Sequence, residues 1–258
     1  MAADWRDAQA VPQLGMRGVE SYKEFLVTSR HRAFAIAPGG TWGWQAELPD
    51  QKLAEQAALQ TCQAETQQRC VLYAVDERVV FDAQAWPRLW GPYLSASAAA
   101  QAPVGVRRGE RFPDLVLRDD AGKTFKVSDL RGKVAVLHFW GSWCGPCRRE
   151  LPDLQKLVHS MEKTRDVRFL FMPVRESFQT ARDWATAQKL RLPLFDAGEK
   201  EFALADGTKL PDRQVAGKFP TTYVLDKHGI VVFAHVGDAS RWGEYAPFLQ
   251  DAMLRSGK

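Results

Sequence analysis

Runs of apolar residues in the second half of the chain alternate with segments in which apolar residues recur every three or four positions. Nearly continuous apolar runs at 134–140 and 167–173 predict strands that are covered on both faces. The three- to four-residue spacing predicts helices at 146–163, 177–189 and 244–254. We also expect strands at 221–225 and 230–235, and a hairpin formed by 112–117 and 124–127. This alternation predicts an α/β layer structure.

The first half of the chain predicts a smaller α+β domain. Short strands are expected at 33–37, 41–44 and 71–75, and a helix at 51–63. Between the halves, residues 95–102 carry no large side chain and are followed by Pro103, which is typical of a linker. The predicted domains are therefore 1–94 and 103–258, joined by a linker at 95–102.

Composition narrows the class of protein. The chain has 258 residues, of which 45% are hydrophobic and 26% charged, enough to bury two cores. Residues 103–258 hold 26 Lys and Arg against 20 Asp and Glu, but without the dense basic clusters of a phosphate-binding surface, so nucleic acid is not an expected partner. No apolar stretch approaches the roughly 18 residues that span a bilayer, so no transmembrane segment is expected.

The four cysteines form two close pairs. Cys62 lies near the end of a predicted helix and Cys70 immediately before a strand, so a structural disulfide would close a small loop; two free thiols or a second redox pair are the alternatives. Paired cysteines suit an oxidising compartment. The paired cysteines lead us to expect an exported protein. Because the first residues lack the apolar core of a signal peptide, its leader or anchor would not be present in this chain, although a cytosolic chain would begin in the same way.

The second pair, in Cys144-Gly145-Pro146-Cys147, follows an apolar strand and opens a helix. The unpaired N–H groups and the dipole of a helix start favour a negative sulfur, which is the reactive form. We expect Cys144 to be exposed and to attack a substrate disulfide, and Cys147 to be withdrawn and to release the product. The alternative is half of a zinc site, which would need two more ligands.

Two further residues near this pair could move protons. Glu150, three residues after Cys147, should lie one turn down the same helix face, as an acid–base group or as an ordinary acidic residue of a first turn. His138 is a polar residue in the apolar strand before the cysteines. It is either a satisfied core histidine or a group that transfers protons or tunes the redox potential.

Several motifs occur together in the order of a known family. They are Leu130-Arg131-Gly132-Lys133, Phe139-Trp140, Trp143-Cys144-Gly145-Pro146-Cys147, Glu150-Leu151-Pro152 and Phe219-Pro220-Thr221-Thr222-Tyr223. Over about 103–256 the chain resembles the TlpA/ResA-like branch of the thioredoxin superfamily. The resemblance implies a thioredoxin fold, a mixed sheet flanked by helices with an added N-terminal β-hairpin. It also implies a catalytic Glu150, a cis Pro220 beside the cysteines, and a substrate segment that contacts Trp143 and pairs with the backbone of Phe219.

Two positions depart from the family's pattern. His138 stands where thioredoxins carry a buried aspartate and many TlpA-like proteins an asparagine, and Phe219 is bulkier than the residue that often precedes the cis proline. Proton transfer and substrate preference are therefore expected to differ. The first half resembles small exported domains of unknown function and names no activity.

The sequence therefore predicts a periplasmic or otherwise extracytoplasmic thiol-disulfide oxidoreductase. The Gly-Pro dipeptide between the cysteines is that of thioredoxin, a reductant, so we expect a reductase of protein disulfides that needs no diffusible cofactor. A reductase in an oxidising space must be recharged, which implies a membrane-borne electron donor. One alternative is a Cu(I)-handling protein in which the cysteines act with His228 or His235. Another is an interaction protein in which residues 1–94 dock the redox domain near its target.

Overall fold

The computed structural model describes residues 4–256, which divide into two compact units. One unit holds the chain up to Trp90 together with Ala239–Glu244, and the other holds Gly91–Asp238 and the chain from Tyr245 onward. The chain therefore leaves the first unit, builds the second, and returns six residues to the first. The predicted domains, 1–94 and 103–258, do not include this return, and the division into those two domains stays a prediction.

The returning segment is bonded into the first unit. The side chain of Arg241 donates to the backbone oxygen of Val11 at 2.7 Å. The carboxylate of Glu244 accepts a hydrogen bond from the backbone N–H of Gln13 at 2.8 Å. Trp242, between them, is only 2% exposed. The two hydrogen bonds tie residues 239–244 to the first turn of the first unit's chain.

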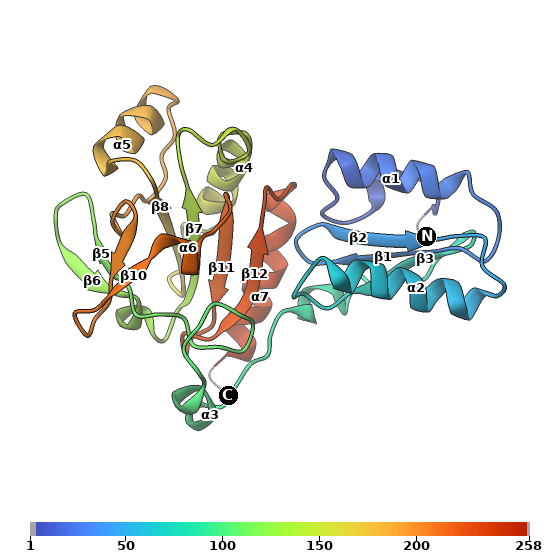
Figure 1. Ribbon diagram of the computed structural model, residues 1–258, viewed down its shortest axis with the longest axis horizontal. Coiled ribbons are helices and arrows are strands. Elements are labelled where there is room, and N and C mark those ends of the chain that lie inside the picture. Colours follow the sequence, from blue (N-terminus) through green and yellow to red (C-terminus); the bar gives the residue numbers. More distant parts are fainter. Residues whose placement is uncertain (1–3, 257–258) are drawn as a thin grey trace. The chain divides into compact units, whose positions relative to one another are not determined.

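The first unit is an antiparallel sheet with a helix on each face (Figure 1). Its strands lie in the order β2 (Thr41–Gln45), β1 (Ala33–Ala37), β3 (Val71–Val75) and β4 (Arg78–Val79). Alanines of β1 pack with Ala54 and Ala58 of α2 (Gln51–Ala64). On the other face the ring of Phe34 meets that of Tyr22 in α1 (Met16–Leu26) edge-on at 4.8 Å. Because side chains of a strand alternate between faces, the two helices bury opposite sides of the sheet.

The predicted disulfide between Cys62 and Cys70 is present in this unit. It joins the last turn of α2 to the residue before β3, with the two Cα atoms 6.2 Å apart. The bridge therefore closes a small loop and ties the helix to the sheet, as the sequence predicts.

Gly43 lets α2 approach the sheet closely. A Cβ atom at this position would lie 2.3 Å from the backbone nitrogen of Cys62 and 2.8 Å from the carbonyl carbon of Thr61. We expect Gly43→Ala to lower the free energy of unfolding by about 3 kcal/mol, because the contact is with backbone that cannot rotate away. Urea unfolding measures this. Gly243→Ala, where no atom lies within 4 Å, is the matched control and should change stability by less than about 0.5 kcal/mol.

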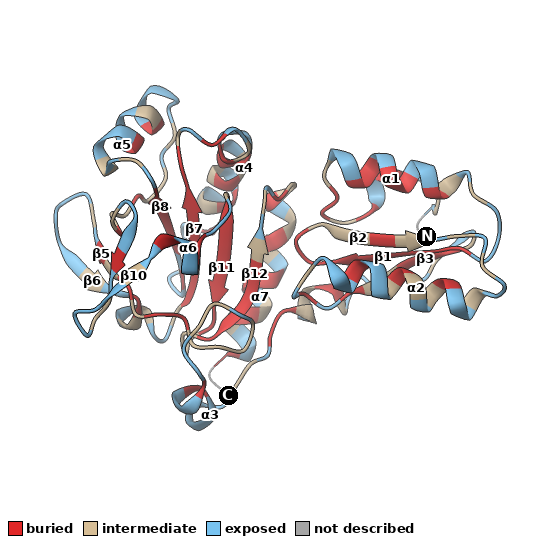
Figure 2. Ribbon diagram, in the orientation of Figure 1, coloured by how far each residue is buried: buried red, intermediate tan, exposed pale blue. Residues whose placement is uncertain are grey.

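The second unit is built on a mixed sheet whose strands lie in the order β12 (Val231–Val236), β11 (Thr221–Leu225), β7 (Val134–Trp140) and β8 (Val167–Pro173). β7 and β8 are parallel, and the other neighbours are antiparallel. Figure 2 shows β7 and β11 buried along their whole length. Central strands covered on both faces require continuous apolar runs, which is why their limits could be predicted from the sequence.

Helices and small hairpins cover the two faces of this sheet. Leu137 and Phe139 of β7 belong to a core with residues of the hairpins, whereas His138 points to the face covered by α4. The helices of the unit are α3 (Ala96–Gln101), α4 (Gly145–Met161), α5 (Phe178–Ala187), α6 (Asp212–Val215) and α7 (Ala246–Arg255). The hairpins are β5 (Val116–Arg118) with β6 (Thr124–Lys126), and β9 (Glu201–Ala203) with β10 (Lys209–Pro211). Short 3₁₀ turns lie at Ala8–Ala10, Trp86–Leu89, Val127–Leu130 and Trp242–Tyr245.

The segment expected to be a linker contains α3. Ser95 caps this helix by accepting a hydrogen bond from the backbone N–H of Ala98. Ala99 and Ala102 are buried and cluster with Ile230. The small side chains of α3 let this helix pack closely within the second unit. Because the segment has no large side chain, nothing in its sequence marked this packing. No helix within residues 4–256 combines the length and apolar character that crossing a membrane requires.

Candidate active site

The two cysteines of the redox motif form a disulfide at the start of α4. β7 ends at Trp140, and Cys144 is the N-cap of the 17-residue helix. Its sulfur accepts a hydrogen bond from the backbone N–H of Cys147 at 3.2 Å. Pro146 lies in the first turn, where its missing N–H leaves no bond unmade. After reduction, the same N–H group and the helix dipole would stabilise a negative sulfur on Cys144.

Cys144 is more enclosed than the sequence predicts, whereas Cys147 is withdrawn. Cys144 is 5% exposed and Cys147 is fully buried. Of the two residues, only Cys144 reaches the surface at all.

The loop before α4 is held by the segment that follows β8. The indole N–H of Trp143 donates to the backbone oxygen of Val174 at 3.0 Å, and the backbone N–H of Ser142 donates to the carboxylate of Glu176 at 2.6 Å. Gly141 is required here, because a Cβ atom would lie 2.3 Å from the Trp143 indole nitrogen. These contacts fix Trp143, which is still 48% exposed, beside the disulfide.

A second loop, at the start of β11, lies against Trp143. The Phe219–Pro220 peptide bond is cis, as the resemblance implies. The ring of Phe219 meets Trp143 edge-on at 5.2 Å, and the guanidinium of Arg175 lies 4.8 Å from the centre of the Phe219 ring. The Arg175 Nε atom donates to the buried carboxylate of Asp212 at 2.6 Å. Phe219 is therefore clamped between an indole and a tethered cation.

Glu150 is buried beneath the disulfide and faces His138. It is 5% exposed, and its Oε1 atom lies 3.3 Å from His138 Nε2. The other ring nitrogen of His138, Nδ1, lies 2.9 Å from the hydroxyl oxygen of Thr222. Burial, with a smaller contribution from the nearby His235, lowers the pKa of His138 to about 3. The imidazole is thus neutral at ordinary pH, with one nitrogen that carries a proton and one that accepts one.

These three side chains form a continuous polar line through an apolar core. Glu150 Oε1 and His138 Nε2 are in close polar contact at 3.3 Å. His138 Nδ1 accepts from the Thr222 hydroxyl or donates to it, according to the tautomer of the imidazole. The tautomer with a proton on Nε2 suits an ionised Glu150, and the tautomer with a proton on Nδ1 suits a protonated one.

The burial of His138 predicts a specific pH dependence of stability. The unfolded chain binds a proton on this histidine below about pH 6.5, whereas the folded chain does not do so until about pH 3, so its contribution is complete above pH 6.5 and is lost as the pH falls. The titratable groups that face it are Glu150 on α4 and His235 on β12. At pH 7.5 we expect His138→Gln to be less stable than wild type.

The pH series separates this effect from simple loss of packing. Between pH 7.5 and pH 4.5, the stability difference between wild type and His138→Gln should shrink by about 3 kcal/mol in urea unfolding. His159→Gln, which alters an 81% exposed side chain on α4, should leave the pH dependence unchanged. A constant difference between wild type and His138→Gln would contradict a neutral buried imidazole.

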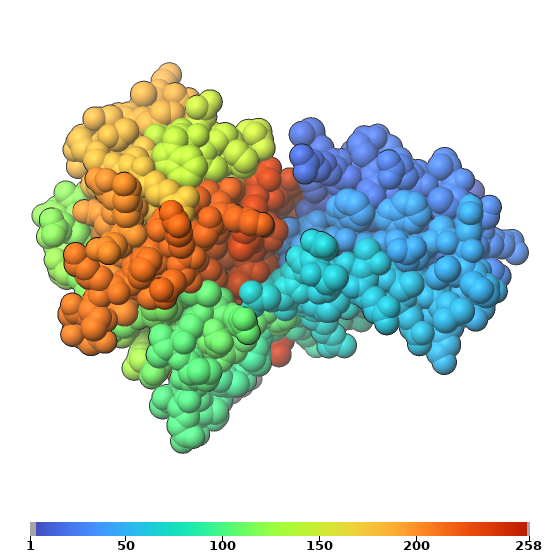
Figure 3. Space-filling model, in the orientation of Figure 1, coloured from blue at the N-terminus to red at the C-terminus, as the bar shows by residue number. Residues whose placement is uncertain are grey.

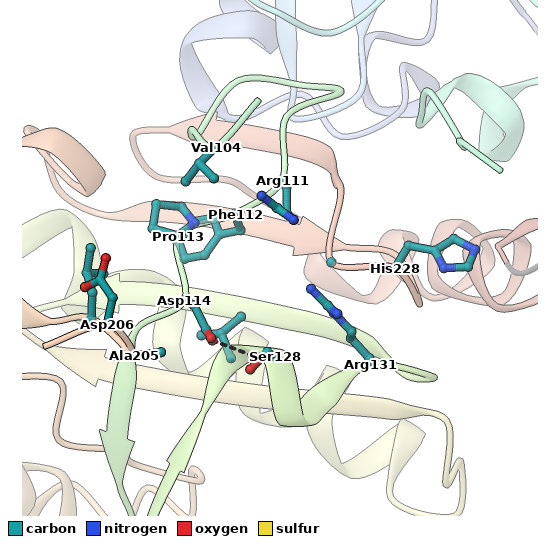
Figure 4. A pocket seen from close by; sticks show the side chains of 13 residues that line it. Val104, Arg111, Phe112, Pro113, Asp114, Ser128, Arg131, Ala205, Asp206 and His228 are labelled. Carbon is teal, nitrogen blue, oxygen red and sulfur yellow. Dashed lines mark hydrogen bonds between the residues drawn. The ribbon is translucent and has the colours of Figure 1, made fainter. Parts of the chain in front are cut away.

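One well-formed pocket lies away from this chemistry. A pocket of about 320 Å³ is lined by Phe112, Pro113, Arg111, Arg131 and the turn at His228 (Figure 4). Arg131 precedes β7 and His228 follows β11, so the pocket is at the end of the sheet opposite Cys144 and Pro220. His228, invoked for Cu(I) binding, is thus remote from the dithiol. Within residues 4–256, no group of three or more His, Cys, Asp or Glu side chains is arranged to hold a metal ion.

Sequence reasoning did not find Thr222, Arg175, Glu176 or Asp212. Thr222 lies directly opposite His138 in the register of β11 with β7, and a polar residue in a buried strand was an available signal. Arg175 and Glu176 are charged residues directly after the buried strand β8, at the edge of the sheet where Cys144 follows β7. No local pattern marks Asp212, because its role depends on Arg175.

A disulfide of the Cys-x-x-Cys type at the start of a helix, next to a cis-proline loop and above a mixed sheet, defines a thioredoxin-like redox protein. The family model described as the AhpC/TSA family matches residues 108–234. The thioredoxin-like protein YneN of Bacillus subtilis is 30% identical over 153 residues, which are 59% of this chain and 83% of that protein. The chain belongs to this thioredoxin-like family and is a thiol-disulfide oxidoreductase.

A further relative agrees in kind. The thiol-disulfide oxidoreductase ResA of Geobacillus thermodenitrificans is 33% identical over 128 residues, which are 50% of this chain and 68% of that protein. A thiol:disulfide interchange protein from Chlorobium tepidum, known from its crystal structure, is 22% identical with a TM-score of 0.43. The match covers 57% of this chain and 97% of that chain. The resemblance and the thioredoxin fold that the sequence predicts are confirmed.

Proposed function

We propose that this protein reduces disulfide bonds in other polypeptides within an extracytoplasmic compartment. The observation that carries the proposal is the Cys144–Cys147 disulfide at the start of α4, with Cys144 the more exposed of the two residues. The dipeptide between the cysteines, Gly145-Pro146, is that of thioredoxin, a strong reductant. The competing direction, oxidation of substrates, would require a stabilised dithiol form.

The reaction has two exchange steps. In the reduced protein, the Cys144 thiolate attacks one sulfur of the substrate disulfide, forms a mixed disulfide and expels the other substrate sulfur as a thiolate. Cys147, once deprotonated, attacks the Cys144 sulfur, which restores the internal bridge and releases the second substrate sulfur. The substrate gains two electrons and two protons, and the protein dithiol loses them.

Glu150 is the proposed acid–base group for the second step. It is buried on the same helix as Cys147, in a core closed to solvent, where bulk water cannot take the Cys147 proton directly. On accepting that proton, Glu150 becomes neutral beside His138 Nε2, 3.3 Å away, while the hydroxyl of Thr222 holds the other ring nitrogen. His138 and Thr222 therefore act as positioning residues for the Glu150 carboxyl group.

Pro220, Trp143 and Phe219 are proposed to hold the substrate. Within residues 4–256, the backbone N–H and C=O of Phe219 make no hydrogen bond, so both can pair with an extended substrate segment. The carbonyl of Pro220 is already used, because it accepts from the N–H of Gly237 at 2.8 Å. The exposed face of Trp143 would cover the apolar side of that segment.

The second disulfide supports the compartment. The Cys62–Cys70 bridge lies in the first unit, separate from the redox motif in the sequence, and serves structure, which fits an oxidising space. A reductant there needs a supply of electrons, so we propose a membrane-borne dithiol donor that reduces Cys144–Cys147 after each turnover. No diffusible cofactor enters this scheme.

The redox potential tests the direction. Equilibration of the Cys144–Cys147 pair with a thiol buffer should give a potential near about −270 mV, the range of thioredoxin. With a chemical dithiol as electron source, the protein should also accelerate the reduction of insulin. A potential above about −180 mV would place the protein among oxidants or isomerases and refute the reductase role.

A further inference from the structure

A groove of about 370 Å³ lies beside the disulfide, on the side of α4 that faces α5. In Figure 3 the yellow-green atoms of the α4 region adjoin the gold atoms of the α5 region at the top of this unit. The lining residues are Gly145, Arg148, Arg149, Pro152, Trp184, Gln188 and Leu190. Gly145 directly follows Cys144, so the groove begins next to the sulfur that attacks the substrate.

The groove combines two cations with an apolar wall. Its lining contains Arg148 and Arg149 and no carboxylate. The side chain of Arg148 makes no hydrogen bond or ion pair within residues 4–256, and Arg149 makes only a long, exposed ion pair with Asp238 at 3.4 Å. Exposed pairs of this kind contribute little, so both guanidinium groups are available to a ligand. The start of α4 adds the positive end of its dipole.

The apolar wall is rigid. The half-buried ring of Trp184 lies 5.7 Å from that of Trp140, which is fully buried at the end of β7. Leu190 and Pro152 extend the same wall. A rigid aromatic surface beside two arginines matches a ligand that carries a bulky apolar side chain and negative charge.

We propose that this groove binds an acidic segment of the partner polypeptide next to its disulfide, with carboxylates at Arg148 and Arg149 and an apolar side chain on Trp184. The inference rests on the proposed function, because the occupant is the substrate whose disulfide meets Cys144. It adds a specificity-determining site on the α5 side of the cysteines, away from Trp143 and Phe219. Substrates would then be selected by the charge that flanks their cysteines.

Two synthetic peptides test the proposal. Each is bridged by one disulfide and carries a leucine beside a cysteine, and they differ only in two glutamates or two glutamines next to that leucine. At low salt we expect kcat/KM of the wild-type protein to be about tenfold higher for the glutamate peptide, and this preference to shrink as salt is raised. Arg148→Gln/Arg149→Gln should remove the preference and keep the rate with the glutamine peptide within about threefold of wild type.

Further variants separate substrate binding from an effect on the sulfur itself. Gln188→Glu, which adds a negative charge to the wall from α5, should slow the glutamate peptide more than the glutamine peptide. Lys156→Gln removes a positive charge from a 78% exposed side chain of α4 outside the groove and should keep the preference. Hydroxyethyl disulfide, a small neutral substrate, reports the reactivity of Cys144 alone.

The outcomes distinguish the inference from the function. Equal rates of the wild-type protein with the two peptides would overturn the groove's role and leave the reductase intact. Loss of activity by one common factor on both peptides and on hydroxyethyl disulfide, in the double arginine variant, would also overturn it, because the arginines would then act on the sulfur. Failure of the wild-type protein to reduce either peptide or insulin would instead refute the proposed function.

Discussion

Cys144→Ser is expected to abolish disulfide reduction, with a rate at least about a thousandfold below wild type, because a serine oxygen cannot form the mixed disulfide. Cys147→Ser should lose turnover to the same extent but should accumulate a covalent adduct with the substrate through Cys144. Insulin reduction measures the turnover, and non-reducing gel electrophoresis with mass spectrometry measures the adduct. The asymmetry follows from the 5% exposure of Cys144 and the full burial of Cys147.

The adduct decides which sulfur attacks. If Cys144→Ser were to accumulate the adduct and Cys147→Ser were not, the order of the two steps would be reversed. Cys62→Ala/Cys70→Ala is the matched control, because it removes a disulfide of the first unit and leaves the exchange chemistry in place. Its catalytic rate should stay within about threefold of wild type at a temperature where it remains folded, although its stability should fall by about 2–4 kcal/mol.

Glu150→Gln should slow turnover by about a hundredfold, the lower range of what a positioned acid–base group contributes. The amide keeps the size of the side chain and a contact with His138, but it cannot accept the proton of Cys147. The loss should appear in the release of substrate from the mixed disulfide rather than in its formation. Rapid-quench measurement of the two steps with a bridged peptide resolves them.

The pH profile provides an independent test of the same residue. The wild-type release step should depend on the protonation of Glu150, and the variant should lose that dependence while it gains rate steadily toward alkaline pH, where hydroxide deprotonates Cys147 directly. Thr222→Val, which removes the far end of the polar line, should shift the wild-type profile and preserve its shape. Equal slowing of both steps in Glu150→Gln would show a structural role only.

Apolar runs made five strands predictable to the residue. The strands at 33–37, 71–75, 134–140, 167–173 and 221–225 have the limits that the sequence predicts, because burial leaves little room for polar residues. Elements whose stability depends on tertiary contacts were missed. α1 has no side-chain cap and contains Gly18, so local signals do not mark where it begins. β9 and β10 have three residues each, and they join the core through Phe202 and Leu210.

The residues of the candidate site also fall into those that the sequence predicts and those that depend on tertiary contacts. Cys144, Cys147, Glu150 and Pro220 are recognisable because their spacing along the chain carries the information. The contact of His138 with Thr222 joins residues that are 84 positions apart, and it depends on the register of β11 with β7. The clamp on Phe219 similarly needs a loop after β8 and a carboxylate from α6. Such long-range pairs follow from topology, which a single sequence does not specify.

Because residues 239–244 return to the first unit, that unit is built from two segments that lie far apart in the sequence. Cutting the chain near residue 95 would strand Arg241 and Glu244 on a fragment that lacks Val11 and Gln13, their bonding partners. Studies that assign separate roles to the two units are therefore better served by point substitutions in the intact chain than by deletion.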